Sequence, residues 1–262
     1  MKFSINNYNE KNINFIKERN LKYDFVNYID EELINDRYSW IFCNEDEESV
    51  AAHRSLIMDN TVILRGLFIS KKLHKSTLQI SILKYVISYY SNMSFCSIIT
   101  FVDDNTQEKE FLIKKFKLKL IKSNIFRASL FIENIPDYSN DTSIRHVFNV
   151  SSNDINKILS QSIYKVFNKE NWIHFLNADN QYINLHYYVD HNILEIDDVI
   201  TNSYDINILK YINIILHKIC NLKIKYININ FSKQLKISLL YIYMNKPRYV
   251  IPNVRIYSLE KN

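Results

Sequence analysis

The chain has 262 residues, of which 47% are hydrophobic, and its formal net charge is +5. This length fits one large domain or two of about 130 residues each. The modest charge, with no continuous basic stripe on a predicted helix, argues against nucleic-acid binding. No apolar run reaches the roughly 18 residues of a membrane-spanning helix, so no span is expected.

Glycine is almost absent, since Gly66 is the only one in the chain, and the abundance of Asn, Ile, Lys and Tyr is typical of an AT-rich genome. Asn and Asp tolerate left-handed backbone angles, so we expect them to form the turns. The predicted turns are Asp59-Asn60, Asp103-Asp104-Asn105 and Asp179-Asn180.

The three cysteines, Cys43, Cys96 and Cys220, lie in or beside apolar runs and show no C-x-x-C spacing. They are interpreted as reduced core cysteines. The N-terminal residues M-K-F-S-I-N-N-Y lack the apolar segment of a signal peptide. We therefore expect a cytoplasmic protein.

The first half of the chain predicts a series of strands and helices that ends in a closing strand. Residues 50–58 and 62–70 alternate as expected for antiparallel hairpins. The predicted elements are strands at 2–5, 39–44, 50–58, 62–70 and 95–102, and helices at 10–19, 78–90 and 105–115.

The second half predicts the same series. Ser151 to Asn153 can cap a helix whose apolar residues have helical spacing. The predicted elements are strands at 145–150, 172–176, 182–189, 193–200, 224–230 and 254–259, and helices at 154–167, 206–220 and 233–243.

Both halves therefore follow the order β-α-β-β-β-α-β-α-β, which predicts an internal repeat. The most loop-like stretch, P-D-Y-S-N-D-T-S at 136–143, separates them. We predict an α/β fold of the mixed α+β type, with two tandem domains at 1–135 and 144–262 and a linker at 136–143. Each domain is expected to have a central mixed sheet flanked by helices.

A basic loop, K-K-L-H-K-S-T at 71–77, joins the strand at 62–70 to the helix at 78–90. Loop N–H groups and the helix dipole at such a place can bind an anionic phosphate. The alternative is an ordinary solvated loop in which Ser76 or Thr77 caps the helix. Glycine, which normally permits close backbone approach, is missing from this loop.

This order of parts resembles the GNAT family of acyl-CoA-dependent N-acyltransferases. Residues 67–83 lie over the family's strand, R/Q-x-x-G-x-G/A loop and helix without a gap. His74 falls where the family has Arg or Gln, and Lys75, Thr77 and Gln79 fall on positions that are usually glycine. The stretch 104–116 resembles the family's Asn-then-Tyr helix. Phe111 lies where a Tyr general acid often sits, and Lys115-Phe116 replaces Gly-Phe.

The resemblance implies an acyltransferase that moves an acetyl or longer acyl group from acyl-CoA, or an acyl-carrier thioester, to an amine acceptor. The donor-binding residues that it implies are Leu67, Ile69, Lys71, His74, Lys75, Ser76, Thr77, Leu78, Gln79 and Asn105. A catalytically inactive GNAT-like binding or assembly protein is the alternative, because the loop glycines and the Tyr are lost. RNA or ribosome binding is a third hypothesis.

Acylation of an amine needs a base. Asp103 and Asp104 follow the strand at 95–102, and Glu195 lies on the central strand of the second half. Strand alternation places Asp197 on the face of Glu195 and Asp198 on the opposite face. The alternative for these carboxylates is an exposed face, or an ion pair with Lys210 or His191.

Other chemistries lack their motifs. The seven histidines show no H-E-x-x-H spacing, and the chain has no G-x-S-x-G, Walker loop or dinucleotide fingerprint. No metal site is expected.

Overall fold

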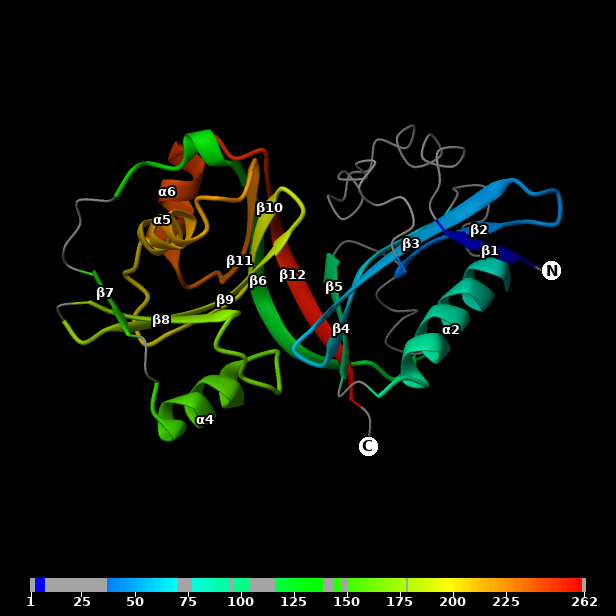
Figure 1. Cartoon of the computed structure of the whole chain (residues 1–262), viewed down its shortest axis with the longest axis horizontal. Coiled ribbons are helices and arrows are strands. Elements are labelled where there is room, and N and C mark those ends of the chain that lie inside the picture. Colours follow the sequence, from blue (N-terminus) through cyan, green and yellow to red (C-terminus); the bar gives the residue numbers. More distant parts are fainter. Residues whose placement is uncertain are drawn as a thin grey trace. The chain divides into compact units, whose positions relative to one another are not determined.

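The computed structural model describes residues 3–7, 37–69, 77–94, 97–103, 116–138, 144–147, 150–177 and 179–260. Within these ranges the chain has a mixed α+β fold in which helices flank mixed β-sheet (Figure 1). It divides into two compact units. The first takes residues 1–101, 116–119 and 257–262, and the second takes 102–115 and 120–256. The helices predicted at 10–19 and 105–115 lie outside the described residues.

The first four strands of the first unit pair antiparallel, and the fourth pairs with the fifth in parallel. The strands of this unit, in spatial order, are β1 (Ser4–Asn7), β2 (Ser39–Cys43), β3 (Ser49–Met58), β4 (Thr61–Ile69) and β5 (Ser97–Asp103), followed by the end of β12 (Tyr249–Glu260). β4 and β5 run parallel. Helix α2 (Thr77–Ser91) contributes Ile82, Val86 and Tyr90 to a core that includes Trp40 and Phe42.

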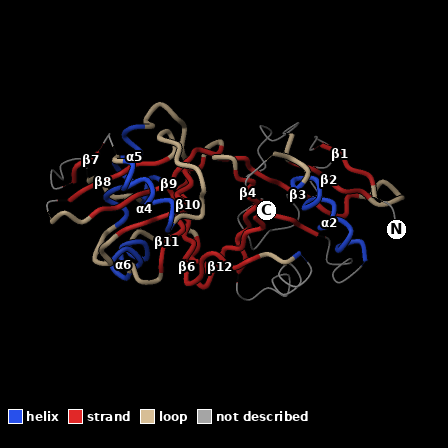
Figure 2. The backbone as a smooth tube through the Cα atoms, turned by 90° about the horizontal axis from the view of Figure 1, so that it is seen from below, coloured by secondary structure: helices blue, strands red, loops and turns tan. Residues whose placement is uncertain are grey.

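The strands of the second unit follow the spatial order β12-β6-β11-β10-β9-β8-β7. Its further strands are β6 (Lys119–Phe131), β7 (Ile144–Val147), β8 (Trp172–Asn177), β9 (Tyr182–Asp190), β10 (Ile193–Thr201) and β11 (Tyr226–Ser232). Its helices are α4 (Ser152–Gln161), α5 (Ile208–Lys218) and α6 (Lys236–Met244), and a short 3-10 turn η3 spans Ile132–Asn134. β6 and β12 run side by side in both views (Figures 1 and 2).

Helix α5 supplies much of the core of the second unit. Ile208, Leu209, Ile212 and Ile215 recur at helical spacing, and all four are fully buried against the sheet. Burial of this apolar stripe stabilises the helix on the sheet, as its periodicity predicts.

The two units repeat one detailed arrangement. β4 pairs with β5 from Thr61↔Ser97 to Leu64↔Thr100, and β10 pairs with β11 from Ile193↔Tyr226 to Ile196↔Ile229. A β-bulge follows at once in each central strand, at the residue after Leu64 and at the residue after Ile196. In both units a helix, α2 or α5, follows this central strand. The internal repeat predicted from the order of elements is thus visible down to the register.

The compact units differ from the expected division at 136–143. β6, which closes the first half of the sequence, pairs with β11 from Tyr226↔Phe131 to Ser232↔Ile125. Conversely, residues from Tyr257 onward belong to the first unit. The first half of the sequence therefore gives β6, from Leu120 onward, to the second unit, and the second half gives the end of β12 to the first unit. The physical reason is that an open strand edge accepts whichever strand satisfies its N–H and C=O groups.

Turns are built without glycine, as expected. Asp59 and Asn60 have φ of 45° and 58° in the two-residue connection between β3 and β4, and Asn180 has φ of 55°. His191 takes the same role between β9 and β10, with φ of 57°. Among the described residues, no helix is both long and apolar enough to cross a membrane.

Candidate functional site

The predicted donor site begins on β4, where this strand leaves β5. The parallel pairing ends at Leu64↔Thr100, whereas β4 continues along β3 as far as Ile69↔Ala51. Within the described strands, Leu67 and Ile69 therefore lie beyond the part of β4 that pairs with β5, and on that edge their backbone groups are not paired with β5. An extended ligand can hydrogen-bond to such an edge.

Helix α2 begins at Thr77, so Thr77, Leu78 and Gln79 form its first turn. Thr77 is exposed, and its carbonyl accepts a hydrogen bond from Ser81 Oγ at 2.9 Å. The first turn holds no acidic residue that would neutralise the helix dipole. The remaining predicted donor and base residues lie outside the described part of the chain; these are Lys71, His74, Lys75, Ser76, Asp104 and Asn105.

Asp103 is the last residue of β5, three positions beyond the pair Leu64↔Thr100. Its counterpart in the second unit is Ser232, which lies three positions beyond Ile196↔Ile229 on β11. Ser232 lines a cavity of about 230 Å³ at the point where β10 and β11 diverge. By the internal repeat, the backbone of Asp103 therefore lies at the corresponding place beyond the pairing of β4 with β5.

The cavity of the second unit has both polar and apolar walls. Its lining includes Asp198, Thr201, Tyr204, Asn230, Ser232 and Gln234. Thr201 and Ser232 are the final residues of β10 and β11, so the cavity occupies the gap between the diverging strand ends.

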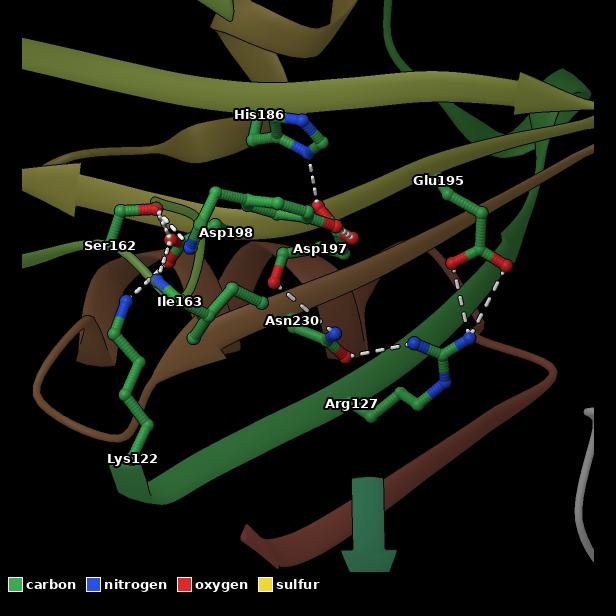
Figure 3. Close-up of polar contacts among 10 residues, drawn as sticks. Lys122, Arg127, Ser162, Ile163, His186, Glu195, Asp197, Asp198 and Asn230 are labelled. Atoms are coloured by element: carbon green, nitrogen blue, oxygen red, sulfur yellow. Dashed lines mark hydrogen bonds and ion pairs between the residues drawn. The ribbon is translucent and has the colours of Figure 1, made fainter. Parts of the chain in front are cut away.

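Glu195 is fully buried in an ion pair with Arg127 (Figure 3). Arg127 Nη2 donates to both carboxylate oxygens of Glu195, at 3.1 and 3.3 Å, and Asn228 Nδ2 donates to Oε1 at 2.8 Å. Arg127 Nη1 also donates to Asn230 Oδ1 at 3.0 Å. The ionic partner of Glu195 is thus Arg127 and neither Lys210 nor His191, and the network holds β6, β11 and β10 together.

Asp197 lies in a second buried group. One carboxylate oxygen contacts His186 Nδ1 at 2.7 Å, and the other accepts a hydrogen bond from the Tyr164 hydroxyl. The rings of Tyr164 and His186 stack with centroids 3.8 Å apart. Burial, followed by the negative charge of Asp197, raises the pKa of Tyr164 well above its ordinary value.

Asp198 is held by three donors from two segments (Figure 3). It forms an ion pair with Lys122 on β6, and its second oxygen accepts hydrogen bonds from Ser162 Oγ at 2.8 Å and Ile163 N at 3.0 Å. Asp197 and Asp198 therefore both contact residues 162–164. Simple alternation places Asp198 on the opposite face, and the bulge between Ile196 and Asp198 breaks that alternation.

The loop that precedes α5 does not fit a phosphate group. Leu209 N donates to Asn207 Oδ1 at 3.1 Å, Ile208 N to Ser238 Oγ at 3.0 Å, and Lys210 N to the Asn207 carbonyl at 3.2 Å. The first amides of the helix are thus already satisfied by the protein. Residues 202–207, N-S-Y-D-I-N, contain an aspartate and no lysine or arginine, in contrast to the basic residues at 71–75.

Sequence reasoning missed Arg127, Tyr164 and His186 as partners of the carboxylates on β10. The available signal was weak: Arg127 and His186 are polar side chains among mostly apolar neighbours, and nothing in the sequence around Tyr164 distinguishes it from the other tyrosines. Within the described residues, no cluster of three or more His, Cys, Asp or Glu side chains could hold a metal ion.

No protein-family model matches the chain, and no curated protein matches it in sequence. Solved structures do match. A protein from Pyrococcus horikoshii, assigned to the acetyltransferases, is 12% identical over 99% of this chain and 90% of its own, with a TM-score of 0.50. The chain shares the fold of this acetyltransferase.

Two further structures with lower TM-scores are GNAT proteins by name. A GCN5-related N-acetyltransferase from Sphaerobacter thermophilus is 8% identical over 98% of this chain and 95% of its own, with a TM-score of 0.48. A tandem GNAT protein of the clavulanic acid biosynthesis pathway is 8% identical over 85% and 82%, with a TM-score of 0.40. At this level of identity the GNAT likeness is one of fold.

Proposed function

We propose that the chain is an acyltransferase that moves an acetyl or longer acyl group from acyl-CoA, or an acyl-carrier thioester, to an amine. We further propose that the first unit binds the thioester. The observation that carries this choice is the difference between the two repeated loops. The α5 amides are satisfied by Asn207 and Ser238, whereas residues 71–75 carry three lysines and a histidine.

The residues present in the first unit fit such a donor. The edge of β4 at Leu67 and Ile69 supplies backbone groups for a pantetheine arm, and the non-acidic first turn of α2 suits its phosphates. The residues proposed to hold the donor are Leu67, Ile69, Lys71, His74, Lys75, Ser76, Thr77, Leu78, Gln79 and Asn105. When bound, the thioester supplies the activated acyl group.

The protein's part in the chemistry is to remove a proton from the amine. The amine nitrogen attacks the thioester carbonyl carbon, the C–S bond breaks, and the amine proton passes to a carboxylate. We propose Asp103 first and Asp104 second for this role, because they follow the carboxyl end of β5. The thiolate needs no Tyr acid at Phe111, since a free thiol has a pKa of about 8.5.

Glu195 is the third carboxylate considered as base. It is fully buried and ion-paired with Arg127, so accepting a proton would disrupt that pair. We therefore propose that Glu195 stabilises the second unit and that the reacting carboxylate is Asp103 or Asp104, at the carboxyl end of β5 or directly after it in the sequence.

Donor binding is tested by calorimetry with acetyl-CoA, a longer acyl-CoA and free CoA. Lys75→Glu should weaken binding by about 1–3 kcal/mol, because it places a carboxylate beside the phosphates. Lys223→Glu, a charge reversal at an exposed residue of the second unit, is the matched control and should bind normally. Equal affinity of both variants and the natural chain would reject the loop as the donor site.

The base is tested by turnover. Asp103→Asn or Asp104→Asn should lower kcat about 100-fold or more while thioester affinity stays nearly unchanged. Glu195→Gln should lose stability instead of showing a selective loss of kcat. If neither aspartate variant changes turnover, the proposed base is wrong.

The alternative function is a catalytically inactive GNAT-like protein used for binding or assembly. It is favoured by the side chains of Lys75, Thr77 and Gln79 at positions where the family usually has glycine, and by Phe111 at the Tyr position. Failure of every acyl thioester and of CoA to bind the intact chain would favour this alternative.

A further inference from the structure

Charge is segregated along the chain to a degree that the overall value of +5 conceals. From Ile206 to Leu259 there are nine lysines and arginines and no aspartate or glutamate. The rest of the chain consequently has a net negative charge. This wholly basic segment forms α5, β11, α6 and most of β12.

Helix α6 carries an exposed apolar stripe in the middle of this basic segment. Leu240, Tyr243 and Met244 are 60%, 56% and 66% exposed, the three highest values for large hydrophobic residues in the described part of the chain. The spacings of three, four and one residues place them on one face of the helix. Ser238 and Ile242, on the other face, are fully buried.

The stripe is bounded by positive charge at both ends. Lys236 begins α6 one turn before Leu240, and Lys246 follows Met244 by two residues; both lysines are exposed. The fold does not require this face to be apolar, because the helix already buries its opposite side. A contiguous exposed apolar patch with a charged rim is typical of an interaction surface.

We propose that this face of α6 docks on an anionic lipid surface. Leu240, Tyr243 and Met244 would enter the boundary between headgroups and acyl chains, and Lys236 and Lys246 would contact the lipid phosphates. An exposed face of Leu, Tyr and Met flanked by lysines combines buried apolar area with attraction to anionic lipids, the two contributions that bind a protein to a bilayer surface. Long lysine side chains reach past apolar neighbours to the headgroups, and the basic segment around them adds attraction to an anionic leaflet.

The same observations argue against other occupants. In a symmetric dimer through α6, parallel packing would oppose each lysine to its own copy, and antiparallel packing would oppose Lys236 to Lys246. Nucleic acid would use the lysines but would leave Leu240 and Met244 in water. An acidic protein helix would need a complementary groove. The exposed side chains of this stripe do not line the cavity at the ends of β10 and β11.

The proposal is tested with the full chain and lipid vesicles, without any thioester. The chain should sediment with phosphatidylcholine vesicles containing about 30 mol% phosphatidylserine and not with pure phosphatidylcholine. Raising the salt from about 0.1 M to about 1 M should weaken binding, because the Debye length falls from about 10 Å to about 3 Å.

Two double variants separate the apolar and electrostatic contributions. Leu240→Ser with Met244→Ser, and Lys236→Glu with Lys246→Glu, should each lower vesicle affinity about tenfold or more. Leu120→Ser and Lys169→Glu change exposed residues outside the basic segment and should bind like the natural chain. Equal melting temperatures would show that all variants are folded.

Lipid docking is overturned if the natural chain does not bind anionic vesicles or binds pure phosphatidylcholine vesicles equally well. It is also overturned if the control variants lose as much vesicle affinity as the double variants. It is also overturned if soluble polyglutamate binds with the same dependence on Leu240 and Met244 while vesicles do not bind. That result would assign the face to an acidic protein.

Discussion

Arg127 on β6 reaches across β11 to the carboxylate of Glu195 on β10, and both side chains are buried. Removing one partner leaves a buried charge without its counter-charge. Glu195→Gln or Arg127→Met should therefore lower the free energy of unfolding by about 3–5 kcal/mol, measured by urea titration.

The double variant Arg127→Met, Glu195→Gln should cost less than the sum of the two single changes, because neither charge remains buried alone. Lys169→Met, at an exposed position, is the control and should change stability by less than about 0.5 kcal/mol. Single variants that resemble this control would contradict the importance of the pair.

The raised pKa of Tyr164 should cause a loss of stability at high pH. Burial, and then Asp197, raise the pKa of its hydroxyl well above the ordinary value of 10.0. Above about pH 10 the unfolded chain releases this proton while the folded chain keeps it, so stability falls as pH rises. The slope attributable to this residue approaches about 1.4 kcal/mol per pH unit.

Tyr164→Phe should lose about 1 kcal/mol at about pH 8 with its hydrogen bond to Asp197. Between about pH 8 and 10.5 it should then lose less stability than the natural chain, measured by urea unfolding at each pH. Tyr243→Phe, at an exposed position, should follow the natural chain. Parallel curves for all three proteins would refute the prediction.

His146 on β7 should titrate below the ordinary value of 6.5. Burial is the largest cause of its lowered pKa, followed by the positive charge of Lys218 and by His174. Since the unfolded chain takes up this proton first as pH falls, stability is lost from about pH 6.5 down to the folded pKa.

Lys218→Met should raise the pKa of His146 part of the way back, as followed by NMR titration of the imidazole signals. Part of the shift should remain, because burial is the larger cause. Lys223→Met, which removes an exposed lysine, should leave the titration as it is. A larger shift in this control than in Lys218→Met would contradict the assignment.

The turn between β3 and β4 should gain from glycine. Asn60 has φ of 58°, a region that costs other residues about 1–2 kcal/mol and glycine nothing. Asn tolerates this left-handed conformation better than most residues but less well than glycine. Asn60→Gly should therefore raise the free energy of unfolding by about 0.5–1 kcal/mol, measured by thermal unfolding. The same change at Asn153, in the first turn of α4, should instead destabilise by about 0.3 kcal/mol, the difference between the helix propensities of Asn and Gly. A loss of stability at both positions would contradict the argument.

Local patterns predicted most of the elements because their causes are local. The cap is an example: Ser151 was expected at the start of the helix and accepts a hydrogen bond from Asp154 N at 3.2 Å. The helix was expected to continue to residue 167 and ends at Gln161. The residues that follow it bond instead to Asp197 and Asp198, which are distant in sequence.

In the site, too, the contacts that could not be predicted are those that depend on pairing between strands distant in sequence. Nothing in residues 119–131 indicates that Arg127 faces Glu195, because the contact depends on β6 pairing with β11. The bulge at Asp197 cannot be predicted either, because the sequence of β10 is compatible with regular alternation of its side chains. β12 starts at Tyr249, earlier than the predicted residue 254, because Pro252 is accommodated inside the strand.

The exchange of closing strands determines the order in which the two units can complete their folding during synthesis. β12 lies beside β5, and its last residues belong to the unit formed by the earliest part of the sequence. On the ribosome, β6 to β11 emerge with their partners before β12 exists. The half that is translated first is therefore the last to complete its sheet, and a premature stop codon shortly before Tyr257 would remove a strand end from the opposite half of the sequence.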